Sequence, residues 1–375
     1  MTGDTLTFRN GRIFDGARCL DGHVAQYENG QLVQLGPEAE IPRHGTDIDL
    51  AGDILFPGFV DLQVNGGGGI LFNADPSVAT LRRMAEAHRA LGVTAFLPTL
   101  ITDTPETTRA AVAATAEALR EGVPGIAGLH LEGPHLSVAR KGAHDAALIR
   151  PMAQADLDAL LDAKRTIPVL KMTVAPESVT EDQVATMAAA GILVALGHSD
   201  ADYATCRRYM DAGARCVTHL FNAMSQLGNR EPGLVGAALA CGTVSAGLIA
   251  DAVHVHPATI RAAWTAKTGP GRIYLVSDAM AVAGSDATEF ELGGRVIRRH
   301  DGRLTLEDGT LAGADLDLAT AVRVMVTEVG IDLPEALAAA TSVPAGLIDL
   351  TYSLNSLSQV TRLASDLSGT VPVTG

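Results

Sequence analysis

The sequence predicts an α/β fold, a (β/α)8 TIM-type barrel joined to a small β-sandwich-like domain. Along most of the 375 residues, nearly continuous apolar runs alternate with Ala-rich amphipathic stretches, and polar motifs follow the ends of most apolar runs. This alternation is typical of a parallel sheet covered by helices. Polar residues at nearly every strand end favour a barrel, because an open doubly wound sheet would concentrate its function in a few loops.

Residues 1–55 predict the small β domain. Turn signals such as Asp21-Gly22 and Asn29-Gly30 separate short runs of alternating polarity, which is the pattern of β-hairpins. We assign residues 1–55 and about 346–375 to this domain, and residues 56–345 to the barrel. The last stretch, from Thr351 to Gly375, is Ser/Thr-rich and weakly patterned, so whether it completes the small domain stays open.

Eight apolar runs are the predicted barrel strands. They are Ile54–Val64, Val93–Ile101, Ile126–Leu131, Val169–Val174, Ile192–Leu196, Cys216–Phe221, Ser245–Ile249 and Ile273–Val276. Ala-rich helical stretches are predicted between most of these strands, for example at Val78–Leu91, Glu106–Leu119, Gln154–Lys164 and Ala201–Ala212, and further helices after the last strand, at about Leu316–Val329 and Leu333–Thr341. An inserted β-hairpin is predicted near residues 288–311, around Asp301-Gly302 and Asp308-Gly309.

The composition excludes several classes of partner. The formal net charge of −15 argues against nucleic acid and anionic membranes, because both need a basic face. The four cysteines are widely spaced and form no C-x-x-C pair, so neither structural zinc nor a disulfide framework is expected. No apolar run approaches the roughly 18 residues of a membrane helix, and residues 1–10 lack the apolar core of a signal peptide. We therefore expect a soluble cytoplasmic protein.

Three potential metal ligands lie at the ends of predicted strands. Glu132, His198 and His219 offer the carboxylate and imidazole groups that suit zinc or a similar divalent ion, and three protein ligands leave a position for water. Any one of these histidines could be an ordinary core histidine, so only the set indicates a metal site. Asp278 follows the last strand and could take a proton from water and deliver it to a leaving group, or it could cap a helix.

Further candidates could bind a substrate. Arg230 and His254 could hold an anion such as a phosphate, because a guanidinium offers a rigid fork of donors. Arg230 could instead form a surface salt bridge with Glu231 or another neighbouring residue. His144 falls in a long loop after the third strand, where a substrate contact and a solvated residue are almost equally expected.

The approach to the first strand resembles that of the amidohydrolase superfamily. The resemblance lies in residues 49–61, Asp-Leu-Ala-Gly-Asp-Ile-Leu-Phe-Pro-Gly-Phe-Val-Asp. The superfamily usually continues with His-x-His, which supplies two metal ligands, whereas this chain has Gln63-Val64-Asn65. The resemblance therefore implies one metal ion rather than two.

The remaining motifs are similar to those of the N-acetylglucosamine-6-phosphate deacetylase family. They occur in order between about residue 8 and about residue 348, and comprise Pro98-Thr99-Leu100, His130 to His135, Ala175-Pro176-Glu177, Gly197-His198-Ser199, Thr218 to Met224, Arg230 to Gly233, Ser277-Asp278-Ala279 and Gly309 to Gly313. The chain departs from the family at its C-terminal end, where Ala364-Ser365-Asp366-Leu367 is only faintly similar to an Ala-Asp-Leu-Val strand.

This resemblance implies a role for each matching residue. Glu132, His198 and His219 would bind one divalent ion per subunit, zinc or else iron or manganese, and Asp278 would be the general base and acid. Substrate contacts would fall at Gln63, Ala143, His144, Asn222, Ala223, Arg230, Asp251, His254, Leu311, Ala312 and Gly313, with Arg230 and His254 on a phosphate. The family is typically homodimeric, with sites close to the subunit interface.

The implied activity is hydrolysis of N-acetyl-D-glucosamine 6-phosphate to D-glucosamine 6-phosphate and acetate, in amino-sugar catabolism. Three alternatives stay open. The substrate could be the galactosamine epimer, the chain could be a cyclic-amide hydrolase or deaminase of the same superfamily, or it could bind a sugar phosphate without turning it over.

Overall fold

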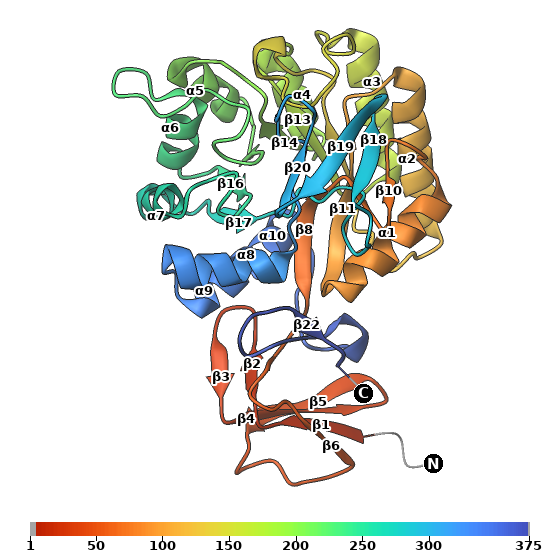
Figure 1. The fold of residues 1–375 in the computed structure, drawn as a ribbon, viewed down its shortest axis with the longest axis vertical. Helices are drawn as coiled ribbons and strands as arrows, with labels where there is room; N and C mark the ends of the chain where they lie inside the picture. The colour runs from red at the N-terminus through yellow and green to blue at the C-terminus, as the bar shows by residue number, and fades with distance from the viewer. Residues whose placement is uncertain (1–4, 374–375) are drawn as a thin grey trace.

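The computed structural model describes residues 5–373, and its centre is an eight-stranded parallel sheet (Figure 1). In spatial order the strands are β17 (Ile273–Leu275), β16 (Ser245–Leu248), β15 (Cys216–Val217), β14 (Leu193–Leu196), β13 (Leu170–Val174), β12 (Leu129–Glu132), β11 (Val93–Ile101) and β8 (Phe59–Val64). A parallel bridge between Val64 and Ala279 joins the two outer strands. The predicted barrel is therefore confirmed.

The predicted first strand has the wrong bounds. The run Ile54–Val64 forms two strands, β7 (Ile54–Phe56) and β8, which belong to different sheets. Pro57 between them has no N–H for a strand ladder, and Gly58 has a φ of 77°, which an extended strand does not allow.

Helices cover the outside of the barrel. They are α1 (Val78–Ala90), α2 (Pro105–Arg120), α3 (Gln154–Thr166), α4 (Glu181–Ala189), α5 (Tyr203–Asp211), α6 (Gly233–Ala240), α7 (Pro257–Ala266), α8 (Leu318–Val324), α9 (Leu333–Ala339) and α10 (Ser342–Leu347); one π-helical turn, η2 (Met325–Val329), extends α8. Side-chain caps begin several of them, for example Ser77 before α1 and Asp202 before α5. None of the helices within residues 5–373 has the length and apolar character needed to cross a bilayer.

Two further sheets contain strands from the N-terminal segment, and one of them also contains two strands from near the C-terminal end. One has the order β5 (Gln31–Pro37), β4 (His23–Glu28), β1 (Thr5–Arg9), β6 (Thr46–Asp49), and the other has the order β22 (Thr370–Val371), β21 (Thr361–Leu363), β7, β2 (Arg12–Phe14), β3 (Cys19–Asp21). Phe8, Tyr27 and Leu55 pack with Leu354 and Val360 in a shared apolar cluster. The domain boundaries at residues 55 and 345 stay predictions.

The insertion after the last barrel strand is a three-stranded antiparallel sheet rather than the single hairpin expected. β18 (Glu289–Leu292), β19 (Arg295–His300) and β20 (Arg303–Thr305) turn first at Gly293-Gly294 and then at Asp301-Gly302. Leu292 and Ile297 pack against Leu71 and Met280, which follow strands of the barrel. This contact holds the insertion at the carboxyl ends of the barrel strands.

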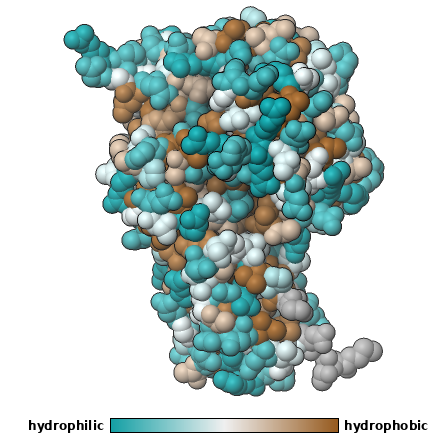
Figure 2. Space-filling view, in the orientation of Figure 1, coloured by the Kyte–Doolittle hydropathy of each residue, from teal (hydrophilic) through white to brown (hydrophobic). Residues whose placement is uncertain are grey.

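On the face shown in Figure 2, hydrophilic residues predominate and hydrophobic residues occur in small groups. This distribution accords with the net charge of −15.

Arg362 ties the C-terminal segment to the small sheets. Its Nε donates to Asp53 Oδ2 at 2.6 Å and its Nη2 to the Leu50 carbonyl oxygen at 3.0 Å. We expect Arg362→Ala to lower the free energy of unfolding by about 1–3 kcal/mol, because Asp53 and the carbonyl lose a charged donor in a mostly buried position. Urea unfolding followed by circular dichroism measures this. Arg303→Ala, at an exposed arginine of β20, is the control; equal losses in both variants would contradict the assigned role.

Candidate metal centre and its cavity

A cavity of about 330 Å³ opens at the carboxyl ends of the barrel strands. Its walls are formed by Asn65, Ile101, Glu132, Ala139, Arg140, Gly142, Ala143, His144, His198, His219, Asn222, Ala223, Ile249, His254, Asp278, Met280, Leu292, Leu311 and Gly313. Parallel barrels gather functional side chains at this end, because the loops after every strand meet there.

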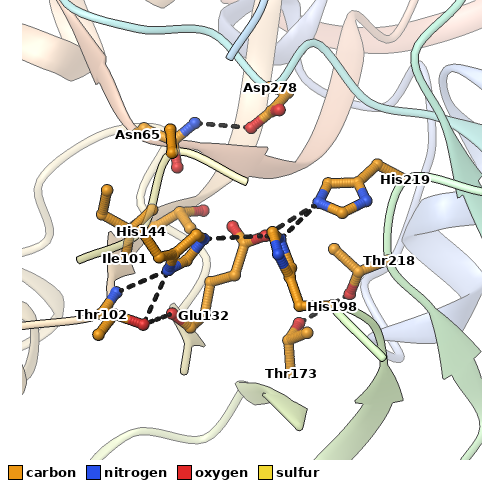
Figure 3. Close-up of polar contacts among 12 residues, drawn as sticks. Asn65, Ile101, Thr102, Glu132, His144, Thr173, His198, Thr218, His219 and Asp278 are labelled. Atoms are coloured by element: carbon orange, nitrogen blue, oxygen red, sulfur yellow. Dashed lines mark hydrogen bonds and ion pairs between the residues drawn. The ribbon is translucent and has the colours of Figure 1, made fainter. Parts of the chain in front are cut away.

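Glu132, His198 and His219 converge on one point of this cavity (Figure 3). Glu132 Oε1 lies 3.0 Å from His198 Nε2 and 3.1 Å from His219 Nε2, and the two Nε2 atoms are 3.0 Å apart. All three side chains are buried. The two histidines have left-handed backbone conformations, with φ of 49° and 30°, which directs both rings inward just after β14 and β15.

The surroundings of these side chains fit a divalent cation. His198 Nδ1 lies 2.8 Å from the Arg140 carbonyl oxygen, which only accepts hydrogen bonds, so Nδ1 carries a proton and Nε2 is the nitrogen left to bind a metal ion through its lone pair. A second imidazole nitrogen and a carboxylate oxygen lie at hydrogen-bond distance from that lone pair. A cation satisfies all three atoms at once, and zinc commonly takes two histidines and a carboxylate.

Electrostatics favour an ionised Glu132. Burial raises the pKa of Glu132, but the contacts with His198 and His219 outweigh burial and hold that pKa well below its usual range. Burial lowers the pKa of His219, yet Glu132 reverses the effect and raises it overall. The centre is therefore anionic until a cation or a proton compensates the carboxylate.

Asp278 follows β17 at the seam of the barrel, where β17 meets β8. It lies beside the residues at the end of β8. Gln63 Nε2 and Asn65 Nδ2 lie 3.1 and 2.7 Å from Asp278 Oδ1. Gln63 Nε2 also lies 3.1 Å from Glu132 Oε2. Burial raises the pKa of Asp278, and the negative charge of Glu132 raises it further. A carboxyl group with a raised pKa suits a residue that must both accept and release a proton.

His144 completes the polar wall of the cavity. Its Nδ1 lies 2.8 Å from Thr102 Oγ1, and its Nε2 lies 3.9 Å from Glu132 Oε1. Burial first, and then the charge of His198, lower the pKa of His144 to about 3. His144 is therefore neutral near pH 7 and can offer a hydrogen bond without adding charge.

Most predicted substrate contacts lie in the cavity wall. Those that line it are Ala143, His144, Asn222, Ala223, His254, Leu311 and Gly313. Gln63, Asp251 and Ala312 do not line it and lie behind it: Gln63 bonds to Glu132 and Asp278, Asp251 Oδ2 lies 2.6 Å from His254 Nδ1, and Ala312 is fully buried.

Arg230 lies outside the cavity. It is exposed, between α5 and α6, and its side chain makes no hydrogen bond or ion pair within residues 5–373. The alternative salt bridge with Glu231 is absent from the same residues; Glu231 Oε1 instead accepts from the N–H groups of Tyr203 and Gly233. The predicted phosphate role of Arg230 stays a prediction.

Sequence reasoning missed three contributors to the site. Arg140 orients His198 through its carbonyl oxygen, Thr102 holds His144, and Asn65 bonds to Asp278. Of these three, only Asn65 could have been recognised in the sequence, because it occupies a position after the first strand where the superfamily has a metal ligand. Arg140 and Thr102 act through tertiary contacts that no sequence motif marks.

Comparisons with known proteins identify a matching family and several similar proteins. The model of the amidohydrolase family matches residues 54–357. An N-acetylgalactosamine-6-phosphate deacetylase of Shewanella sp. (strain ANA-3) is 48% identical over 80% of this chain and 75% of its own. An N-acetylglucosamine-6-phosphate deacetylase of Haemophilus influenzae is 36% identical over 88% of this chain and 86% of its own. The crystal structure of N-acetylglucosamine-6-phosphate deacetylase from Pasteurella multocida superposes with a TM-score of 0.91 at 34% identity, covering 98% of this chain and 97% of that one.

We expect the protein to bind one divalent ion per chain. Elemental analysis of fully loaded protein measures the stoichiometry, and ion at about a hundredfold excess over Kd should stabilise the fold by about 2.7 kcal/mol. His198→Ala and His219→Ala should lose the ion. His135→Ala, at a buried histidine outside the cavity, should keep it. Two tightly held ions per chain would contradict the effect assigned to Gln63 and Asn65.

Proposed function

This chain belongs to the amidohydrolase family, and we propose that it hydrolyses N-acetyl-D-glucosamine 6-phosphate to D-glucosamine 6-phosphate and acetate. The observation that carries the proposal is the convergence of Glu132, His198 and His219 with Asp278 in one cavity at the barrel mouth. The named relatives support the deacetylation of a phosphorylated amino sugar.

Glu132, His198 and His219 are the proposed ligands of one divalent ion, most simply zinc, with iron or manganese as alternatives. When bound, such an ion lowers the pKa of a water and polarises a carbonyl group. Asp278 removes a proton from the water as the water oxygen attacks the acetyl carbon. Asp278 then gives that proton to the nitrogen, and the carbon–nitrogen bond breaks. The products are the amine and acetic acid, and the acid gives its remaining proton to the amine or to solvent to become acetate.

The remaining wall residues orient the substrate. Neutral His144 can donate a hydrogen bond to the acetyl oxygen, on which negative charge develops. Asp251 fixes the ring of His254 through Nδ1, which leaves Nε2 of that ring for a phosphate oxygen. The phosphate is bound far from the acetyl carbon, so its binding holds the acetyl group in one orientation relative to Asp278. This orientation lowers the activation free energy of hydrolysis.

We place Arg230 in the site of a second copy of the chain. Arg230 is exposed outside its own cavity, and the apolar side chain of Leu227 on the same segment is 58% exposed. A homodimer that buries Leu227 would bring Arg230 to the phosphate of its neighbour. Four free cysteines suit the reducing cytoplasm in which we place the enzyme.

A second candidate is the epimer N-acetyl-D-galactosamine 6-phosphate, which the 48% identical Shewanella relative favours. An acetate-release assay on both 6-phosphates and both unphosphorylated sugars distinguishes the two. Two other functions are tested alongside it. Turnover of a hydantoin or dihydroorotate would support a cyclic-amide hydrolase. Binding without acetate release would support a sugar-phosphate binding protein.

Asp278→Asn should reduce kcat by at least 10²–10⁴-fold, because an amide cannot accept the proton of water. The fold, the metal content and the substrate affinity should change little. Single-turnover acetate release, elemental analysis and a binding isotherm measure these quantities. Retention of more than about a tenth of wild-type kcat would remove Asp278 from the mechanism.

Arg230→Ala should lower kcat/KM for the phosphorylated sugar by roughly ten- to a hundredfold, the value of one charge-assisted contact, and should spare any activity on the free sugar. Arg109→Ala, at an exposed arginine of α2, is the control.

Co-expression of Arg230→Ala with Asp278→Asn tests where Arg230 acts. If it acts across the dimer, each mixed dimer has one complete site, and about a quarter of all sites are restored. If it acts within its own chain, the mixture stays as inactive as the single variants, and the placement in a second copy is wrong.

A further inference from the structure

The two ends of the Asn65 side-chain amide have different surroundings. Asn65 Nδ2 lies 2.7 Å from Asp278 Oδ1 (Figure 3). Asn65 Oδ1 is buried and has no hydrogen-bond partner within residues 5–373, although the residue lines the cavity and is only 2% exposed. Buried carbonyl oxygens usually have a partner, so this oxygen is a candidate acceptor for a ligand.

The orientation of this amide is fixed. The backbone N–H of Asn65 donates to the Ala279 carbonyl oxygen at 2.8 Å, and its carbonyl oxygen accepts from Phe72 N–H at 2.9 Å. Asp278 Oδ1 also accepts from Gln63 Nε2 at 3.1 Å, so rotating the Asn65 amide by 180° would bring two acceptor oxygens together in place of a donor and an acceptor. Gln63 Oε1 also lacks a partner among the described residues, but Gln63 does not line the cavity.

We propose that Asn65 is a substrate-contacting residue whose Oδ1 accepts the N–H of the acetamido group. This inference rests on the proposed function. Asp278 must give its proton to the acetamido nitrogen, so that nitrogen lies beside Asp278 during the reaction. Asn65 is the cavity-lining residue hydrogen-bonded to Asp278, and its free acceptor therefore lies next to the same nitrogen.

The contact strengthens as the reaction proceeds. The acetamido nitrogen keeps its own hydrogen throughout, and Asp278 protonates the lone pair of that nitrogen before the carbon–nitrogen bond breaks. The nitrogen is then positively charged until the carbon–nitrogen electron pair moves to it and the neutral amine leaves. The charge makes its N–H a better donor, so the bond to Asn65 Oδ1 is stronger in the transition state of bond breaking than in the bound substrate. The other end of the amide occupies Asp278 Oδ1 and leaves Oδ2 for the proton that is transferred.

The test compares the N-acetyl substrate with its ester analogue, 2-O-acetyl-D-glucose 6-phosphate, which has no N–H. Asn65→Leu removes the donor and the acceptor at nearly constant volume, whereas Asn65→Asp removes the donor and keeps an acceptor. Loss of the contact to Asp278 lowers kcat/KM for both substrates. Loss of the acceptor affects only the amide, so we expect Asn65→Leu to lower the amide-to-ester ratio of kcat/KM by roughly 10–100-fold, as for a bond to a charged group. Asn65→Asp should leave that ratio within about threefold of wild type.

If Asn65→Leu leaves the amide-to-ester ratio of kcat/KM unchanged, the proposal is wrong. The role of Asn65 is then limited to positioning Asp278. Circular dichroism and one equivalent of bound metal establish that each variant is folded, and Asn65→Ala, which also lacks the donor and the acceptor, provides the comparison if the leucine variant fails either criterion. As a binding measurement, wild type should prefer D-glucosamine 6-phosphate over D-glucose 6-phosphate, and Asn65→Leu should lose this preference. Wild-type protein that releases acetate from neither acetylated substrate would refute the proposed function itself, which is a different outcome.

Discussion

Closure of the barrel between β8 and β17 is the constraint on which the site depends. Besides the Val64–Ala279 bridge, Asp278 N–H donates to the Gln63 carbonyl oxygen at 3.1 Å, and Asn65 N–H donates to Ala279 at 2.8 Å. These backbone bonds bring together segments more than two hundred residues apart in the chain. Without them, Asp278 would have neither its amide donors nor a fixed distance to the histidines.

The closed seam also determines how two carboxylates share a buried site. The buried carboxylates of Glu132 and Asp278 repel each other when both are ionised, and the pKa of Asp278 rises partly for that reason. Gln63 Nε2 lies 3.1 Å from an oxygen of each, so one amide offsets part of both charges. A donor that engages both carboxylates leaves them less free to bind a second cation. The amides after β8 therefore support the inference of one metal ion rather than two.

The errors in the predicted fold share a cause. Periodicity located the barrel because each strand is buried on both faces and each outer helix is amphipathic. The helices named from the sequence include none of α4, α6 and α7, and α6 has no periodic signal, since all but its last residue are buried and its sequence has no polar face. The periodicity also predicted β7 and β8 as one strand, because both are apolar. A local sequence pattern does not indicate which sheet a strand belongs to. Gly293-Gly294 was overlooked as a turn, so the insertion was assigned too few strands.

The sequence by itself determined the barrel, the family and the chemical groups of the site, because strand ends, ligand types and motif order are local properties. Tertiary structure decided how those groups act. It brought the ligand atoms of Glu132, His198 and His219 together, placed Gln63 and Asn65 on Asp278, and left Arg230 outside the cavity. These are distances between atoms on different strands and loops, and they depend on barrel closure and on left-handed residues at strand ends. No run of neighbouring residues contains that information.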